Sequence, residues 1–338
     1  MTAPLDPPAA TATTLDLPHL RVTRLEVRAR ATRDAPTPPY LGTTLRGAIG
    51  QALRHLACTT GAPTCAGCPR LAACAYGAVW EGGAAGDLGE LARGADAPRP
   101  YVLAWEPPGR RPGGLRRGDP LRFGVTVLGR AARWLDYLVI ALRDGLAHGL
   151  GSDRAPFALE RVELATRDAP ITLWADGMLV PWTTLPTFTL RELAERSAAH
   201  ITERASLTFA TPLSITVENR RADVPTLVAL TQRLSERIER LRRAWSDHPG
   251  DEPPLDWRAL VQLATHVPVL AVDTHIHRFE RQSRRVDEPV PMAGVVGRLE
   301  LGRLPAPLAR LLSAGALVHV GKQATFGFGR LHLESARP

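Results

Sequence analysis

The segment VHVGKQATFGFG, residues 318–329, brings a lysine, a threonine and three glycines into one short stretch. The glycines are Gly321, Gly327 and Gly329. Glycine adopts positive φ readily and allows close backbone approach, so a row of amide N–H groups could face an anion. Lys322 and Thr325 would add an ammonium and a hydroxyl. The spacing is not GxxxxGK[ST], so we expect a phosphate-binding loop rather than a nucleotide-binding P-loop, with a plain helix-to-strand connection as the alternative.

Lys322 is the only lysine among 42 basic residues, and the formal net charge of the 338-residue chain is +8. Codon bias accounts for most of the replacement of lysine by arginine, but it does not account for the positive balance. Guanidinium groups bind phosphate in a bidentate manner. The composition therefore favours a polyanionic partner, and nucleic acid in particular.

A second basic stretch, HRFERQSRR at residues 277–285, mixes arginines with an aromatic side chain. Its arginines are Arg278, Arg281, Arg284 and Arg285. Guanidinium groups suit phosphate contacts, and Phe279 offers a surface on which a base could stack. The alternative is a solvated charged strand and turn.

Four cysteines lie within 17 residues, spaced C-x6-C-x2-C-x5-C. They are Cys58, Cys65, Cys68 and Cys74. The first residues lack the basic and apolar regions of a signal peptide, so we expect a structural zinc site rather than disulfides or free thiols. An iron–sulfur cluster is an alternative without distinctive spacing. We expect such a site to staple a cysteine-rich insertion, residues 58–74.

The sequence VDTHIH contains an HxH pair, His275 and His277, with Asp273 nearby. This pattern is typical of the first strand of metal-dependent hydrolase barrels. Only 61 residues follow His277. That length is too short for seven more strand–helix units, so this hydrolase is a remote alternative.

Hydrophobic periodicity predicts the order β-α-β-β-α-β in the first half of the chain. The expected strands are 20–32, 101–107, 121–129 and 157–166, and the expected helices are 43–58 and 133–151. This order is that of a ferredoxin-like unit, an antiparallel sheet with two helices on one face. The second half repeats the theme less cleanly, with strands at 207–220, 272–281, 292–302 and 329–334 and helices at 227–245, 255–267 and 307–318.

The fold class that we expect is therefore α+β, with two tandem ferredoxin-like domains. The predicted parts are a disordered tail (1–18), a first domain (19–170), a linker (171–205) and a second domain (206–338) that contains the glycine-rich loop 319–329. No apolar run reaches the length of a membrane span, so we expect a cytoplasmic protein without membrane contact.

The segment HVGKQATFGFGRL, between the last helix and the last strand, resembles the C-terminal glycine-rich loop of the RAMP superfamily of CRISPR-associated proteins. Further matches follow in chain order, from about residue 40 to 331. They are YLGTTLRGAIGQALRHLAC, CPRLAACAYGAVWE, PRPYVLAWEP, RFERQSRR and GVVGRLEL. More narrowly, the chain resembles the endoribonucleases that cut precursor CRISPR RNA within its repeats.

This resemblance implies a metal-independent reaction in which the 2′-OH attacks the adjacent phosphate and leaves a 2′,3′-cyclic phosphate and a 5′-hydroxyl. Such a reaction needs a base, an acid and positive charge on the phosphorane. In the family, a histidine on or near the first helix serves, sometimes with a tyrosine and a lysine. The corresponding candidates are His55, its rival His319, Tyr40 and Lys322.

The partners implied are CRISPR repeat RNA and other Cas proteins of an effector complex. A non-catalytic RAMP subunit that binds CRISPR RNA remains the main alternative. The sequence does not distinguish the two.

Overall fold

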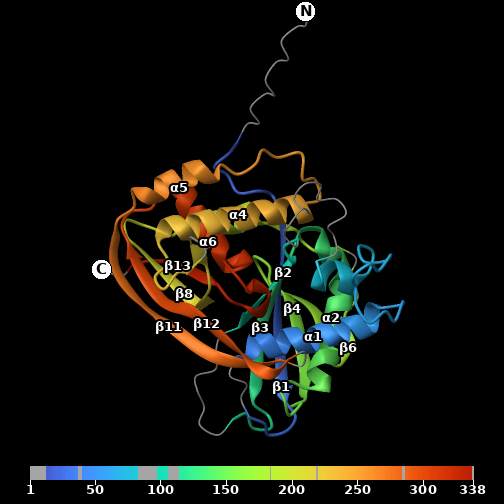
Figure 1. Ribbon diagram of the computed structural model, residues 1–338. Coiled ribbons are helices and arrows are strands. Elements are labelled where there is room, and N and C mark those ends of the chain that lie inside the picture. The colour runs from blue at the N-terminus through green and yellow to red at the C-terminus, as the bar shows by residue number, and fades with distance from the viewer. Residues whose placement is uncertain are drawn as a thin grey trace, which may run out of the picture.

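The computed structural model describes residues 13–36, 40–82, 97–105, 114–182, 184–217, 220–283 and 286–336. Its first domain contains β1 (Arg21–Ala31), α1 (Leu41–Ala57), β2 (Tyr101–Trp105), β3 (Pro120–Leu128), α2 (Leu135–His148) and β4 (Phe157–Leu164). The four strands pair in the order β2-β3-β1-β4, every neighbouring pair antiparallel. The predicted ferredoxin-like order is confirmed. Figure 1 shows α1 and α2 beside this sheet.

Alternation of apolar and polar residues explains how β1 sits in the sheet. Leu25, Val27 and Ala29 are buried, while Glu26 and Arg28 between them are exposed. In α1, residues spaced by three and four place Leu45, Ile49 and Leu53 in the core. Leu56, in the last turn of α1, is 38% exposed.

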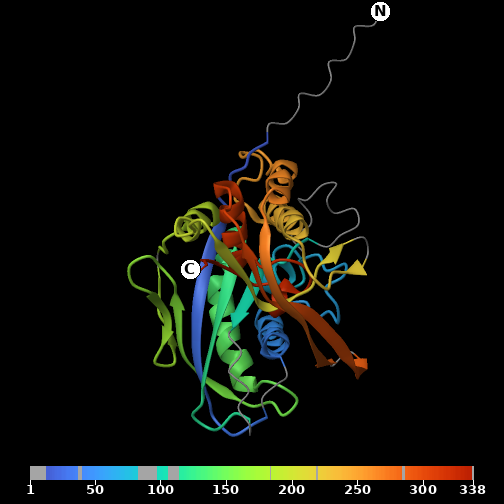
Figure 2. The same cartoon turned by 90° about the vertical axis from the view of Figure 1, so that its left-hand side faces the viewer.

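The second domain contains β8 (Ala205–Leu213), α4 (Leu227–Trp245), α5 (Trp257–Thr265), β11 (Val269–Ser283), β12 (Val286–Leu301), α6 (Ala306–Val318) and β13 (Leu331–Ser335). Its sheet runs β11-β12-β8-β13, again antiparallel. Two short strands, β9 (Thr216–Val217) and β10 (Arg220–Arg221), form a separate pair after β8. In Figure 2, β11 and β12 form a long curved hairpin that extends away from the helices.

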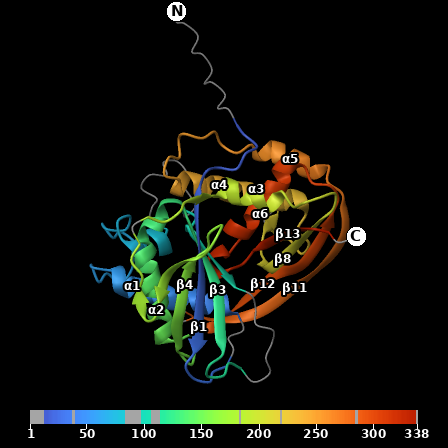
Figure 3. The same ribbon diagram turned by 180° about the vertical axis from the view of Figure 1, so that it is seen from behind.

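The stretch 171–205 was predicted as a linker, but much of it belongs to the first domain. It holds β5 (Ile171–Ala175), β6 (Met178–Leu179), β7 (Phe188–Thr189) and α3 (Leu190–Ala198). β5 pairs with β4, and β7 pairs with β1. Thr189 and Glu192 form a reciprocal capping box that fixes the start of α3. Seen from behind in Figure 3, α3 lies beside α6 of the second domain.

The predicted disordered tail also needs correction in its described part. Thr14 bridges to Leu255, and its carbonyl accepts a hydrogen bond from the Asp256 amide at 2.7 Å. Leu17 is buried in the core. Residues 13–18 therefore pack on the second domain, and residues 1–12 lie outside the described residues.

The domains meet where the end of α4 reaches the turn after β3, a turn that continues as a 3₁₀ helix (Gly129–Trp134). Trp245 is fully buried, and its indole N–H donates to the Pro98 carbonyl at 2.8 Å. Gly129 has φ of 57°, and a Cβ there would lie 1.8 Å from the Trp245 carbonyl oxygen. The close backbone contact thus requires glycine and holds the two domains together.

Among the described residues, no helix combines the length and apolar character that crossing a membrane requires.

Candidate functional site

The glycine-rich loop connects α6 to β13 and contains a short 3₁₀ helix, η5 (Ala324–Phe326). Most of its amides already have partners inside the protein. The N–H groups that donate to backbone carbonyls are those of Val320, Lys322, Phe326, Gly327, Phe328 and Gly329. The expectation that a row of free amides faces a phosphate therefore fails for these residues, because their donors are used to hold the loop.

The glycines instead let the loop interlock with the first domain. Gly327 has φ of 87°, and a Cβ there would lie 2.7 Å from the Leu103 carbonyl oxygen of β2. A Cβ on Gly42, near the start of α1, would lie 1.9 Å from the Phe326 carbonyl oxygen. Gly321 and Gly329 have positive φ and are likewise packed against backbone. The loop therefore packs tightly against both α1 and β2.

Two guanidinium groups lie close to the Phe326 ring of this loop. The Cζ of Arg46, from α1, lies 5.1 Å from the centre of the Phe326 ring, and that of Arg281, from β11, lies 5.3 Å from it. Burial, and then the charge of Arg46, lower the pKa of Arg281. Among the residues that the structure describes, neither guanidinium has a carboxylate partner. Two cations that lack a carboxylate partner among the described residues favour binding of an anion here.

A buried hydroxyl holds Arg46 in place. Its Nε donates to the Tyr101 hydroxyl at 3.1 Å, and the hydroxyl of Thr325 lies next to the same group. Burial raises the pKa of Tyr101 to about 12, so the phenol stays neutral and available as an acceptor. Thr325 therefore supports the arginine through Tyr101.

A cluster of aromatic side chains lies beside the two arginines. The rings of Tyr40 and Phe279 are stacked, with centroids 4.8 Å apart and an angle of 15°. Trp105 and Phe328 contact Tyr40 edge-on at 5.0 and 5.1 Å. We call the surface formed by Arg46, Arg281, Phe326 and Phe279 the arginine groove.

Tyr40 was expected as a catalytic candidate, but the structure makes it a packing residue. Its side chain is only 5% exposed. Burial raises the pKa of the Tyr40 phenol far above its ordinary value, and neighbouring Trp105 offsets this only in part. A phenol enclosed by three rings is not a proton carrier for a substrate.

His319 is also buried rather than exposed to a substrate. It caps the C-terminus of α6 with φ of 57°, and its Nδ1 lies 3.1 Å from the Phe328 carbonyl oxygen. Burial, followed by the charges of Arg237 and Arg330, lowers the pKa of the His319 ring to about 3. The ring is therefore neutral, and its role is to hold the loop.

This lowered pKa predicts a measurable dependence of stability on pH. Between about pH 6.5 and 3, His319 is protonated in the unfolded chain but neutral in the folded chain. The free energy of unfolding therefore falls as pH falls through this window. We expect His319→Asn, a residue that tolerates positive φ, to remove roughly 2–3 kcal/mol from the stability difference between pH 7 and 4.5. Urea unfolding at both pH values measures this. His332→Asn, at an exposed histidine, should leave the difference unchanged; an unchanged difference in His319→Asn would contradict the buried neutral ring.

The remaining sequence candidates divide between the groove and other surfaces. His55 is exposed in the last turn of α1, about 20 Å along the helix axis from the end that meets the loop. Lys322 is exposed at the start of the loop. Arg278 lies three residues before Arg281 on β11, so its side chain projects from the opposite face of the sheet. Arg284 and Arg285 lie outside the described residues.

Sequence reasoning missed Arg46, Tyr101 and Phe326 as parts of the site. The signal available was the spacing in α1: Arg46 follows Leu45 and lies one turn after Gly42, on the edge of the buried stripe. That Gly42 touches the loop could not be read from the sequence, because the contact joins segments almost 300 residues apart.

The four cysteines line one small cavity after α1 but do not form an assembled metal site. All four are unpaired thiols of intermediate exposure. Cys74 contacts the Ala57 carbonyl, and Thr60 lies between Cys58 and Cys68 at 3.7 and 3.9 Å. In the part of the chain that the structure describes, no group of three or more ligands is arranged for a metal. The geometry does not support zinc, and zinc content stays a prediction.

The hydrolase alternative based on the HxH pair is wrong at the level of fold. His275 and His277 lie on β11, an edge strand of an antiparallel four-stranded sheet. A metal-dependent hydrolase barrel would place them on the first of eight parallel strands.

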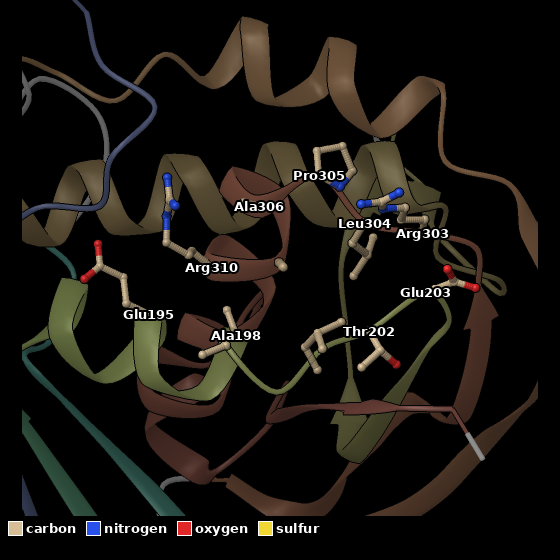
Figure 4. Close-up of a pocket in the computed structure, with 12 residues that line it drawn as sticks. Glu195, Ala198, Thr202, Glu203, Arg303, Leu304, Pro305, Ala306 and Arg310 are labelled. Atoms are coloured by element: carbon tan, nitrogen blue, oxygen red, sulfur yellow. The ribbon is translucent and has the colours of Figure 1, made fainter. Parts of the chain in front are cut away.

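A separate cavity of about 540 Å³ lies at the other end of α6 (Figure 4). Its rim combines Glu195 and Glu203 with Arg303 and Arg310. Arg310 is already paired with Asp16 at 3.1 Å. Because α6 is about 18 Å long, this mixed-charge cavity is distinct from the arginine groove and does not suit a polyanion.

The two ferredoxin-like domains and the glycine-rich loop between α6 and β13 have the architecture expected from the resemblance to the RAMP superfamily. More narrowly, residues 207–331 match the family described as CRISPR-associated endoribonuclease Cas6, and residues 20–182 match a family described as an N-terminal domain. The second domain of the chain is therefore similar to the Cas6-type CRISPR-associated endoribonucleases.

Solved structures show the same fold along nearly the whole chain. A Thermus thermophilus Cas6 in a product complex has 18% identity and a TM-score of 0.55, covering 92% of this chain and 98% of that one. The same Cas6 in a second structure gives 16% identity and a TM-score of 0.52, covering 93% and 98%. A partial Cas6–RT–Cas1–Cas2 complex has 15% identity and a TM-score of 0.56, and the match covers 96% of this chain and 47% of that one. No curated protein sequence matches the chain.

Proposed function

We propose that the protein is an endoribonuclease that binds precursor CRISPR RNA in the arginine groove and cleaves it within the repeats. The observation that carries this proposal is the pair Arg46 and Arg281 around Phe326, without a carboxylate partner in the described part of the chain. A phosphodiester would neutralise both guanidinium groups, and a flanking base could stack on the exposed part of Phe326.

The family match and the fold support this assignment. The similar Thermus Cas6 was solved as a product complex, which is consistent with a cleaved RNA bound by this fold. The similar Cas6–RT–Cas1–Cas2 complex supports association with other Cas proteins as part of the proposal. The exposed Lys322 at the loop would add a phosphate contact outside the groove.

The proposed chemistry is attack of a 2′-oxygen on the adjacent phosphorus. The bond from O2′ to phosphorus forms and the bond from phosphorus to O5′ breaks, giving a 2′,3′-cyclic phosphate and a 5′-hydroxyl. Negative charge builds on the non-bridging oxygens in the transition state, where Arg46 and Arg281 would stabilise it.

This route predicts cleavage without a divalent ion. CRISPR repeat RNA incubated with the protein in EDTA should be cut, and mass spectrometry of the products should show a cyclic phosphate on one fragment and a 5′-hydroxyl on the other. A single 2′-deoxy nucleotide at the cut site should abolish cleavage at that site, because the nucleophile is missing.

The contrary outcome is loss of cleavage in EDTA with recovery on adding magnesium. Circular dichroism in the same buffer controls for unfolding through the cysteine segment. Tight binding of repeat RNA without cleavage under either condition would favour the non-catalytic RNA-binding subunit.

A further inference from the structure

The proposed cleavage needs a group that accepts the proton of the 2′-hydroxyl, and the structure removes three of the four expected candidates, while Lys322 is assigned to a phosphate contact outside the groove. His319 and Tyr40 are buried, and His55 lies at the far end of α1. The groove as described so far therefore has charge but no base. A base must be exposed, must lie beside the groove and must carry a titratable nitrogen or oxygen.

His277 meets these conditions. It is exposed on β11, and its ring centroid lies 5.6 Å from that of Phe279, at an angle of 38°. Phe279 in turn stacks on Tyr40 and lies 5.9 Å from Phe328, so it is anchored in the floor of the groove. The imidazole thus stands at the edge of the aromatic floor and remains open to a substrate.

The alternation of the strand places the histidine and an arginine on one face. In β11, His277, Phe279 and Arg281 are spaced by two residues, so their side chains project from the same side of the sheet. Each faces a β12 residue in regular antiparallel register, and both register shifts of this strand pair lie outside residues 277–281. His277 and the cationic end of the groove are therefore held by one rigid strand, with Phe279 between them.

We propose that His277 is the general base of the cleavage reaction, an assignment that rests on the proposed function. Its neutral imidazole takes the proton of the 2′-hydroxyl while O2′ bonds to phosphorus. The O5′ atom leaves and takes a proton from water, and the imidazolium returns its proton to solvent. No proton is gained or lost overall, and Arg281 carries the phosphorane charge.

The test compares His277→Ala with His275→Ala, the neighbouring histidine on the same face of the same strand, for which no contact with Phe279 is present in the described residues. Cleavage of a synthetic CRISPR repeat RNA is followed under single-turnover conditions, and binding is measured with the 2′-deoxy RNA. We expect His277→Ala to lose about 10²–10⁴-fold in rate with binding changed less than about threefold. His275→Ala should stay within about threefold in both.

Added imidazole gives a readout that a packing role would not produce. It should restore part of the rate of His277→Ala and leave wild type and His275→Ala unchanged. His277→Gln, which keeps a polar side chain of similar size, should be as slow as His277→Ala and as stable as wild type.

Three outcomes separate the claims. If wild type cleaves and His277→Ala retains the rate within about fivefold, His277 is not the base. The same holds if His277→Ala loses both rate and RNA binding and imidazole does not restore the rate. In both cases the proposed function stands. If wild type cleaves no repeat RNA, the proposed function and the base assignment both fail. A slow, tightly binding and imidazole-rescued variant supports both.

Discussion

Arg46→Ala is expected to lower the single-turnover rate of RNA cleavage by about 10²–10³-fold, the size seen when one donor to a developing oxyanion is removed. The same effect is expected for Arg281→Ala, because the two guanidinium groups lie at similar distances from the Phe326 ring. Each variant should also reduce the salt slope of log K for binding by up to about 1. Filter binding at several salt concentrations and a single-turnover assay measure both quantities.

Arg278→Ala is the matched control for Arg281→Ala. It removes the same charge from the same strand, but from the opposite face. Arg46→Lys should recover only part of the activity, since an ammonium cannot both contact Tyr101 and present a planar fork to phosphate. Equal, small effects of Arg281→Ala and Arg278→Ala would mean that charge acts only through the general field of the protein and that the groove is not the site.

Gly327→Val should destabilise the protein by about 3–5 kcal/mol, through the strain of positive φ and a collision with the first domain. A Cβ would lie 2.7 Å from the Leu103 carbonyl oxygen, a backbone atom that cannot turn away. RNA binding should weaken too, because the loop would shift relative to α1 and so would the spacing of Arg46 and Arg281. Thermal and urea unfolding, with RNA affinity measured on the folded fraction, test this.

Gly118→Val is the control that has the strain of positive φ without a steric clash. Gly118 has φ of 91°, close to the 87° of Gly327, but a Cβ there meets nothing within 4 Å. It should cost only about 1–3 kcal/mol and leave RNA affinity unchanged. If both variants lose the same stability and keep the same affinity, the loop is not the joint that sets the groove.

The order of helices and strands could be predicted from the sequence because the apolar periodicity of each segment reflects which of its faces is buried. The helix predicted at 227–245 matches α4 at both ends, where Thr226 caps the first turn. The segment 171–205 was misassigned because β5 to β7 are short and gain their stability from pairing with β4 and β1, which is not visible in local composition.

The site was harder to predict because it depends on contacts between distant segments. The glycine-rich loop and Arg281 were found, since glycine spacing and clustered arginines are local signals. His319 was misread because the pattern Val-His-Val does not reveal that both faces of the segment are covered. Arg46 and the position of His277 become meaningful only once α1, β11 and the loop are brought together.

The central claim is that the scissile phosphate lies in the arginine groove. Photo-crosslinking tests it most directly: a CRISPR repeat RNA with 2′-deoxy at the cut site and 4-thiouridine beside it is bound, irradiated and digested, and the crosslinked peptides are identified by mass spectrometry. Crosslinks should fall on peptides that contain Phe326, Phe279 or His277, and Arg46→Ala should diminish them. Crosslinks confined to the far face of the first sheet, or to the cavity near Arg303, would contradict the claim.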